Sequence, residues 1–157
     1  MANNLRWRYG DTNPVMLPVE VGYIVEVGDL LYQEVDDVRS ASSMADQGTL
    51  EANQELFHDT FVGVAMQASR AEDSEPIRVA TGGVFEFDCI SEAFEVGDLV
   101  GGNEEGTGTQ LDAQVVRSVA TPNLAIGRCV KRVATPGSKV LVDIVSTVVR
   151  GGPQAAA

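Results

Sequence analysis

Side chains that carry out chemistry are scarce in this chain of 157 residues. It has one histidine and two cysteines, and no Gly-x-Ser-x-Gly, Cys-x-x-Cys or His-Glu-x-x-His pattern. Neither a nucleophile elbow nor a zinc site is therefore predicted. His58 precedes Asp59 without a nucleophile nearby, and we interpret it as a histidine at a helix end. We expect no enzyme activity, no metal and no cofactor.

The chain also lacks the features of a disulfide-rich or membrane protein. Two cysteines are too few for a disulfide framework, and both Cys89 and Cys129 lie in apolar strand patterns. We expect buried free thiols, with a single Cys89–Cys129 bridge as the alternative. No apolar run approaches the ~18 residues of a membrane span, and the N-terminus lacks a signal-peptide core. The expectation is a soluble chain made without an export signal.

Positive charge is scarce as well, and it is unevenly placed. The net charge is −12, and only two of the 11 basic residues are lysines, Lys131 and Lys139. Residues 1–110 hold 5 basic and 21 acidic residues, whereas residues 111–157 hold 6 basic and 2 acidic residues. A surface that binds phosphate needs clustered basic residues, so nucleic acid is not an expected partner. The positive end favours an acidic neighbour, such as another copy of the chain.

What the chain does contain is an internal repeat. Residues 25–31 read VEVGDLL and residues 94–100 read FEVGDLV, an offset of 69 positions. The same offset aligns the Gly-Gly pair at 82–83 with the pair at 151–152. We therefore predict two copies of one β unit, residues 14–82 and 83–151, within a single domain.

The repeated phrase predicts a strand, a turn and a second strand. Alternating apolar and acidic residues are typical of a half-buried strand, and the Gly-Asp pair that follows favours a turn. Turn chemistry explains Asp29 and Asp98 without a catalytic role as paired carboxylates. The residues expected to define the turns and the fold are Gly28, Asp29, Gly97, Asp98, Gly63 and Gly127.

The remaining pattern predicts a mostly β fold, a compact barrel or sandwich of about a dozen short strands. Residues 45–58 interrupt the alternation and favour one short helix near 49–57. Residues 101–110 predict a flexible loop, and residues 135–138 (TPGS) predict a hairpin turn. The longer strands expected in the second unit are residues 115–119, 124–133 and 140–149.

Both ends of the chain lie outside the repeats. Residues 1–13 are polar, and basic and aromatic residues alternate at positions 6–9. Tryptophan, tyrosine and arginine are enriched at interfaces. We predict a docking arm that orders on binding, with a mobile leader as the alternative. Residues 152–157 are expected to be a disordered tail. The arm residues predicted to contact a partner are Arg6, Trp7, Arg8 and Tyr9.

Several of these segments resemble a known family. The phrase at 25–31, followed by FHDTFVGVA at 57–65 and IRVATGGVFEF at 77–87, is similar to the capsid decoration, or cement, proteins of tailed bacteriophages. The closing phrases AIGRCV at 125–130 and VLVDI at 140–144 fit the same pattern. The resemblance covers residues 15–149. It points to a group long described only as a domain of unknown function encoded beside major capsid genes.

The resemblance implies a structural virion protein on the outer surface of an icosahedral head. It implies that the chain clamps neighbouring major capsid subunits, as a homo-oligomer with a trimer favoured and a dimer as the alternative. It implies synthesis in the host cytoplasm. From the charge and the lack of a long apolar run, we expect no contact with nucleic acid or membrane. The alternative from another class is a non-viral carrier or ligand-binding barrel, similar to lipoyl and biotinyl domains. That alternative needs a modifiable lysine, and neither Lys131 nor Lys139 has the expected sequence setting.

Overall fold

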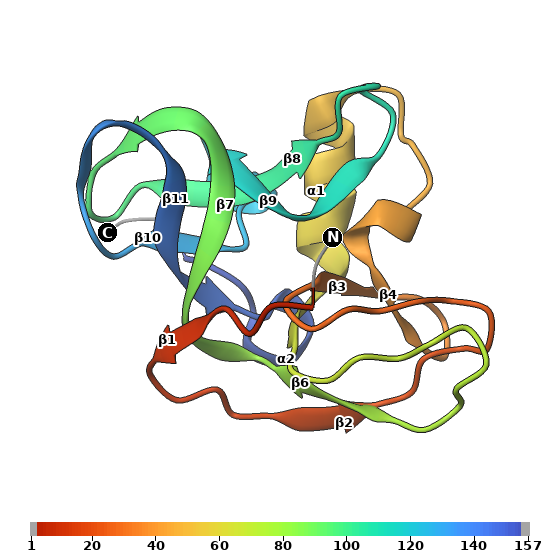
Figure 1. Ribbon diagram of the computed structural model, residues 1–157. Helices are drawn as coiled ribbons and strands as arrows, with labels where there is room; N and C mark the ends of the chain where they lie inside the picture. The colour runs from red at the N-terminus through yellow and green to blue at the C-terminus, as the bar shows by residue number, and fades with distance from the viewer. Residues whose placement is uncertain (1–2, 155–157) are drawn as a thin grey trace.

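The computed structural model describes residues 3–154 and folds them into eleven strands, two α-helices and two 3-10 helices (Figure 1). The mostly β class, built from two similar units with one short helix in the insertion, is confirmed. The strands are β1 (Trp7–Tyr9), β2 (Val15–Leu17), β3 (Leu30–Gln33), β4 (Val38–Ser40), β5 (Phe61–Ala65), β6 (Ile77–Ala80), β7 (Gly82–Phe94), β8 (Leu99–Glu104), β9 (Leu111–Ser118), β10 (Gly127–Cys129) and β11 (Val133–Val145). The helices are η1 (Ala41–Ser43), α1 (Leu50–Thr60), η2 (Pro122–Leu124) and α2 (Thr147–Arg150).

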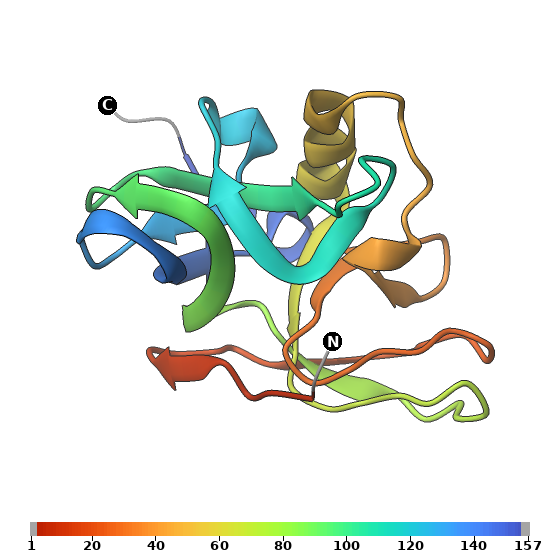
Figure 2. The same cartoon turned by 45° about the horizontal axis from the view of Figure 1, so that its top comes forward.

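Five strands close into a barrel. Their order is β7-β11-β10-β8-β9, and parallel pairing of β7 with β9 joins the two ends. The long strand β7 curves strongly in Figure 2 and takes two partners along one edge. It pairs with β1 at Val84 and Phe85, and with β9 at Asp88 and Cys89. The N-terminal segment therefore adds a sixth strand to the barrel sheet.

The other five strands form a second sheet in the order β2-β6-β5-β3-β4, with antiparallel pairing throughout. Each strand has a counterpart at the same place in the repeat: β2 with β7, β6 with β11, β5 with β10, β3 with β8, and β4 with β9. Replacing each strand by its counterpart reproduces the barrel order. The two similar units seen in the sequence thus have the same strand order in space.

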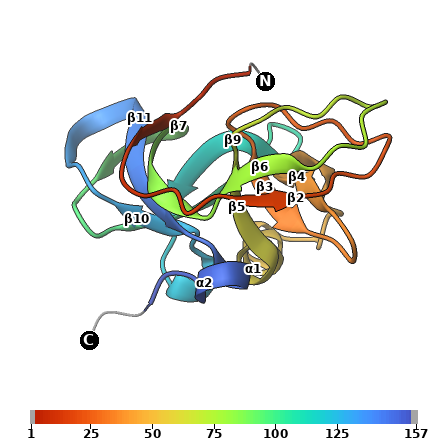
Figure 3. The same ribbon diagram turned by 90° about the horizontal axis from the view of Figure 1, so that it is seen from below.

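The larger hydrophobic core lies between the barrel, the second sheet and α1, and it contains all five phenylalanines. Helix α1 begins where Thr49 caps it, because the Thr49 side chain accepts a hydrogen bond from the Ala52 N–H at 3.1 Å. Its apolar side is anchored by the fully buried Phe57. Figure 3 shows the short helix α2 beside α1, on the side of the molecule away from β1.

The turn and fold-defining residues act in matched pairs. Gly28 and Gly97 have φ of +96° and +95°, and each following aspartate accepts a hydrogen bond from the backbone N–H three residues earlier. The Asp29 and Asp98 distances are 3.0 and 2.8 Å. Gly63 and Gly127 instead allow close strand contact, because a Cβ atom there would lie 1.8 and 2.3 Å from a backbone oxygen of the neighbouring strand. Turn chemistry therefore accounts for the repeated phrase.

Four local predictions need correction. Residues 135–138 do not form a hairpin turn, because β11 continues through them with two register shifts against β7. The predicted strand 124–133 is instead η2, β10 and the start of β11, and the strand expected to reach residue 149 ends at Val145. Residues 101–104 belong to β8, so the predicted loop is confined to the turn before β9.

The predictions for the two chain ends also need correction within the described residues. The N-terminal segment is paired with β7 rather than free. At the other end, Gly152 and Pro153 are buried, and Arg128 Nη2 donates a hydrogen bond to the Gln154 carbonyl oxygen at 2.6 Å. Residues 1–2 and 155–157, which also belong to the predicted arm and tail, lie outside the described residues.

Candidate functional site at the N-terminal segment

The N-terminal segment first crosses the Gly-Asp turn of the first unit. The Asn4 N–H donates to the Val27 carbonyl oxygen at 2.9 Å, and the Val27 N–H donates to Asn3 Oδ1 at 2.8 Å. At the corresponding turn of the second unit, Val96 is 67% exposed, and no segment within residues 3–154 pairs with that turn in the same way. The segment therefore breaks the equivalence of the two units.

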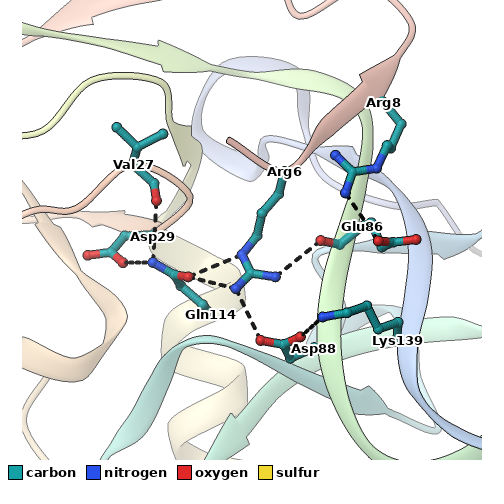
Figure 4. A network of polar contacts seen from close by, with 8 residues as sticks. All are labelled: Arg6, Arg8, Val27, Asp29, Glu86, Asp88, Gln114 and Lys139. Atoms are coloured by element: carbon teal, nitrogen blue, oxygen red, sulfur yellow. Dashed lines mark hydrogen bonds and ion pairs between the residues drawn. The ribbon is translucent and has the colours of Figure 1, made fainter. Parts of the chain in front are cut away.

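Arg6 then enters the interior. Its guanidinium donates from Nε and Nη2 to Gln114 Oε1 at 3.1 and 2.8 Å, and from Nη1 to the Glu86 carbonyl oxygen at 3.3 Å. Nη2 also forms an ion pair with Asp88 Oδ2 at 3.1 Å. Figure 4 shows this guanidinium between β7 and β9, with Asp88 shared by Lys139. Arg6 therefore fixes the segment to two barrel strands at once.

Gln114 extends this network to the first unit. Its Nε2 donates to Asp29 Oδ1 at 2.8 Å and to the Val27 carbonyl oxygen at 3.4 Å. Burial raises the pKa of the Asp29 carboxyl above its ordinary value, and the hydrogen bonds from Gln114 and from the Glu26 N–H offset this only in part. The network thus connects the N-terminal segment, the barrel and the turn of the other unit.

Asp88 lies at the outer end of the network and behaves differently. Burial raises its pKa, but hydrogen bonds from Lys139 and Arg6 outweigh that effect, so the pKa lies below the ordinary value. The carboxylate is therefore charged at neutral pH and pairs with both cations. This arrangement holds the charges of Arg6, Asp88 and Lys139 in place.

Strand β1 itself presents its side chains to the outside. Trp7 and Tyr9 are 39% and 53% exposed, and the side chain of Arg8 is paired with Glu86 Oε1 at 3.1 Å. Trp7 Nε1 donates to the Gly10 carbonyl oxygen at 3.0 Å, which fixes the indole against its own chain. We call the surface formed by Leu5, Trp7, Arg8 and Tyr9 the arm face.

The four predicted contact residues therefore divide into two groups. Three of them, Trp7, Arg8 and Tyr9, are accessible. Arg6 is only 4% exposed, and its guanidinium is bonded to other residues of the chain. The expectation that Arg6 contacts a partner is therefore corrected. Sequence reasoning missed Gln114 and Asp88. Gln114 stands in an ordinary strand pattern, and nothing in that pattern marks it as the partner of a residue 108 positions away.

The remaining candidates show no catalytic arrangement. His58 Nδ1 lies 2.7 Å from the Ala125 carbonyl oxygen, so this nitrogen donates the proton and the ring serves as a helix-end tether. Cys89 and Cys129 are buried free thiols, as predicted. Over residues 3–154 no group of three or more His, Cys, Asp or Glu side chains is arranged to hold a metal. Nor does any helix in that part of the chain have the length and apolar character needed to span a membrane.

Comparison with known proteins gives the family. Residues 33–144, most of both units, match the family described as phage cement protein. The chain belongs to the phage cement protein family. A solved structure, the head fiber gp8.5 N base of bacteriophage phi29, is similar with a TM-score of 0.44 and 20% identity, covering 83% of this chain and 93% of that one. No curated protein matches the chain.

Membership of the phage cement family makes this chain a structural protein of the phage head, which is the coarse function that the sequence resemblance implied. The family is structural and usually without enzyme activity. It also favours the capsid hypothesis over the carrier alternative, whose candidate lysines are the exposed Lys131 and the Asp88-paired Lys139.

Proposed function

We propose that this cement protein binds the outer surface of an icosahedral head through the arm face and clamps neighbouring major capsid subunits. The observation that carries the proposal is the position of Trp7 and Tyr9, which are exposed on a short strand whose base, Arg6, is buried. Tryptophan, tyrosine and arginine are enriched among the few residues that dominate binding at protein interfaces.

The buried base has an energetic consequence for binding. Ordering a free terminal segment on association costs binding energy for every residue that becomes fixed. Here Arg6 and the pairing of β1 with β7 fix the segment before any partner is met. The binding energy of the Trp7 and Tyr9 side chains can therefore contribute to affinity, because little of it is needed to order the segment.

Stabilisation of the head then follows from mass action. A protein that binds only the assembled capsid shifts the assembly equilibrium toward the assembled state. The shift grows with the ratio of the protein's free concentration to its dissociation constant. A homo-oligomer, with a trimer favoured over a dimer, would bring several arm faces to one capsid site and bridge adjacent subunits. We propose that the chain is made in the host cytoplasm and reaches heads there, without contact with nucleic acid or membrane.

The test is binding to expanded heads that lack this protein, measured by co-sedimentation and counted as copies per head. The wild type should bind saturably, and Trp7→Ala/Tyr9→Ala should weaken binding by about tenfold or more. The control is Val21→Ala/Val96→Ala, which also shortens two exposed side chains, 57% and 67% exposed, away from the arm face.

Two results would count against the proposal. Failure of the wild type to bind heads would reject the cement function for this chain. Equal weakening by the arm-face and control variants would reject the arm face as the contact. Heads carrying the wild type should also retain their DNA to a higher temperature than bare heads.

A further inference from the structure

The β3–β4 hairpin ends in an exposed apolar side chain with acidic neighbours. The Glu34 N–H donates to the Asp37 carbonyl oxygen at 2.8 Å, which closes the hairpin and turns Val35 outward. Val35 is 87% exposed, more than any other large hydrophobic side chain described. Asp37 is neutralised by Arg39 at 3.0 Å, which leaves Glu34 and Asp36 as the acidic residues flanking Val35. We call residues 34–37 the acidic tip.

A groove of opposite character lies on the barrel beside the β10–β11 connection. Its volume is about 190 Å³, several times the roughly 30 Å³ that one water occupies in the liquid. Its lining includes three apolar side chains and three cations. The residues that line it are Glu86, Lys131, Arg132, Val133, Lys139, Val140 and Leu141. We call it the basic groove.

The cations of the groove are not equivalent. Lys139 is paired with Asp88, and Arg132 is paired with Glu95 at 2.9 Å. Lys131 is exposed and forms no ion pair with any residue from 3 to 154. It is therefore a positive charge without a counterpart, on a chain whose net charge is −12.

The acidic tip and the basic groove lie at opposite ends of the molecule. In Figures 1 and 2 the β3–β4 hairpin lies to the right, and the β10–β11 connection lies to the left. The two features therefore cannot meet within one chain. They can meet only between two copies, with the tip of one copy in the groove of the next.

We propose that the acidic tip and the basic groove form a head-to-tail contact between copies of this chain. The isopropyl group of Val35 enters the groove against Val133 and Leu141, and Asp36 pairs with Lys131 of the next copy. The contact is heterologous, because the two copies contribute different surfaces. Such a contact closes into a ring, as in a trimer, or extends to further copies. It also places an acidic neighbour beside residues 111–157, the positively charged part of the chain.

The contact has a definite electrostatic signature. Two copies with a net charge of −12 each repel one another, and an orientation that joins tip to groove reduces this repulsion. Raised salt screens the Asp36–Lys131 attraction and the general repulsion together. Charge reversal at a single residue separates the local attraction from the general repulsion. It turns the Asp36–Lys131 attraction into a repulsion, and it changes the net charge of the chain by a known amount.

The test is self-association of the purified full-length chain, followed by analytical ultracentrifugation over a concentration series. We expect Asp36→Lys and Lys131→Glu each to weaken association by about tenfold, as charge reversal at a close pair does. The double variant Asp36→Lys/Lys131→Glu restores the opposite charges in reversed order and should return to within about threefold of the wild type. Val35→Ala should weaken association without changing the charge.

The matched control is Glu72→Lys, which makes the same change of net charge as Asp36→Lys at an exposed residue of another loop. It should leave association unchanged or slightly strengthened. The proposal is overturned if the wild type is monomeric at every concentration, if the double variant does not recover, or if Glu72→Lys acts like Asp36→Lys.

This contact stands apart from the proposed capsid function, because the assay contains no heads. Loss of head binding by the tip and groove variants of a chain that is always monomeric would identify a capsid subunit as the occupant and reject the contact between copies. Normal self-association of a chain that does not bind heads would reject the capsid proposal alone.

Discussion

Replacing Arg6 with methionine removes the guanidinium at the centre of the network while keeping most of the aliphatic stem. The Arg6 side chain donates to Gln114, to the Glu86 carbonyl oxygen and to Asp88. Gln114 is fully buried, so its Oε1 would lose two donors with no solvent to replace them. Asp88 would keep Lys139, and its side chain is 34% exposed.

The expected loss follows from these contacts. Hydrogen bonds to a charged group contribute about 1.5–3 kcal/mol, and an ion pair near the surface contributes about 0.5 kcal/mol. Relief of the buried guanidinium's desolvation offsets part of this cost. We therefore expect Arg6→Met to lower the free energy of unfolding by about 2–3 kcal/mol. For a chain of this length that corresponds to a fall in Tm of about 5–10 °C.

The assay is urea unfolding together with thermal unfolding, and the control is Arg8→Met. Arg8 lies two residues further on, but its side chain is 43% exposed and its pair with Glu86 is at the surface, so its replacement should cost less than about 1 kcal/mol. An equal effect of the two substitutions, or a loss below about 1 kcal/mol for Arg6→Met, would refute the assignment of Arg6 as the buried base of the arm face.

Three further predictions concern the fold. Gly63→Ala should lower the free energy of unfolding in urea by about 3 kcal/mol, because its Cβ atom would meet a backbone oxygen. The control Gly106→Ala has open space around its Cβ atom and should change stability by less than about 0.5 kcal/mol. Equal losses of stability in the two variants would contradict the close contact at Gly63. Burial raises the pKa of Cys89 to about 11 and also raises the pKa of Cys129, so a thiol reagent at pH 8 should label the native protein slowly and the unfolded protein at once. Fast labelling of the native protein would contradict the burial of these thiols. The folded state binds the Asp29 proton more tightly than the unfolded state does, so stability from this group is present below about pH 4 and is lost as the pH rises through the folded-state pKa. Unfolding free energies over a pH series should show the wild type losing stability relative to Asp29→Asn as the pH rises, and a constant difference would contradict the raised pKa.

Local chemistry explains the parts of the structure that were predictable. The Gly-Asp turns follow from the positive φ of Gly28 and Gly97 and from aspartate side chains that bond to the backbone three residues earlier. The helix was predicted within a few residues because its segment lacks strict alternation and is rich in alanine, leucine, glutamate and glutamine, which favour a helix. The repeat also predicted two similar units, because the same pattern of apolar and turn residues favours the same strand pairings.

The hairpin predicted at residues 135–138 shows where local chemistry was overruled. Pro136 and Gly137 favour a turn in isolation. Strand β7 nevertheless offers a long curved edge, and β11 follows it past both residues with two register shifts. The partner strand, rather than the local turn residues, decided the path of the chain.

The sequence by itself determined the β class, the duplicated unit, the turns and the scarcity of reactive groups, because each depends on residues close together in the chain. Only the tertiary structure decided that Arg6 is buried while Trp7 and Tyr9 are exposed. That division depends on Gln114, 108 residues away, and on the closure of β7 against β9. A buried charge needs partners at hydrogen-bond distance, and no short-range pattern records which distant strand will supply them.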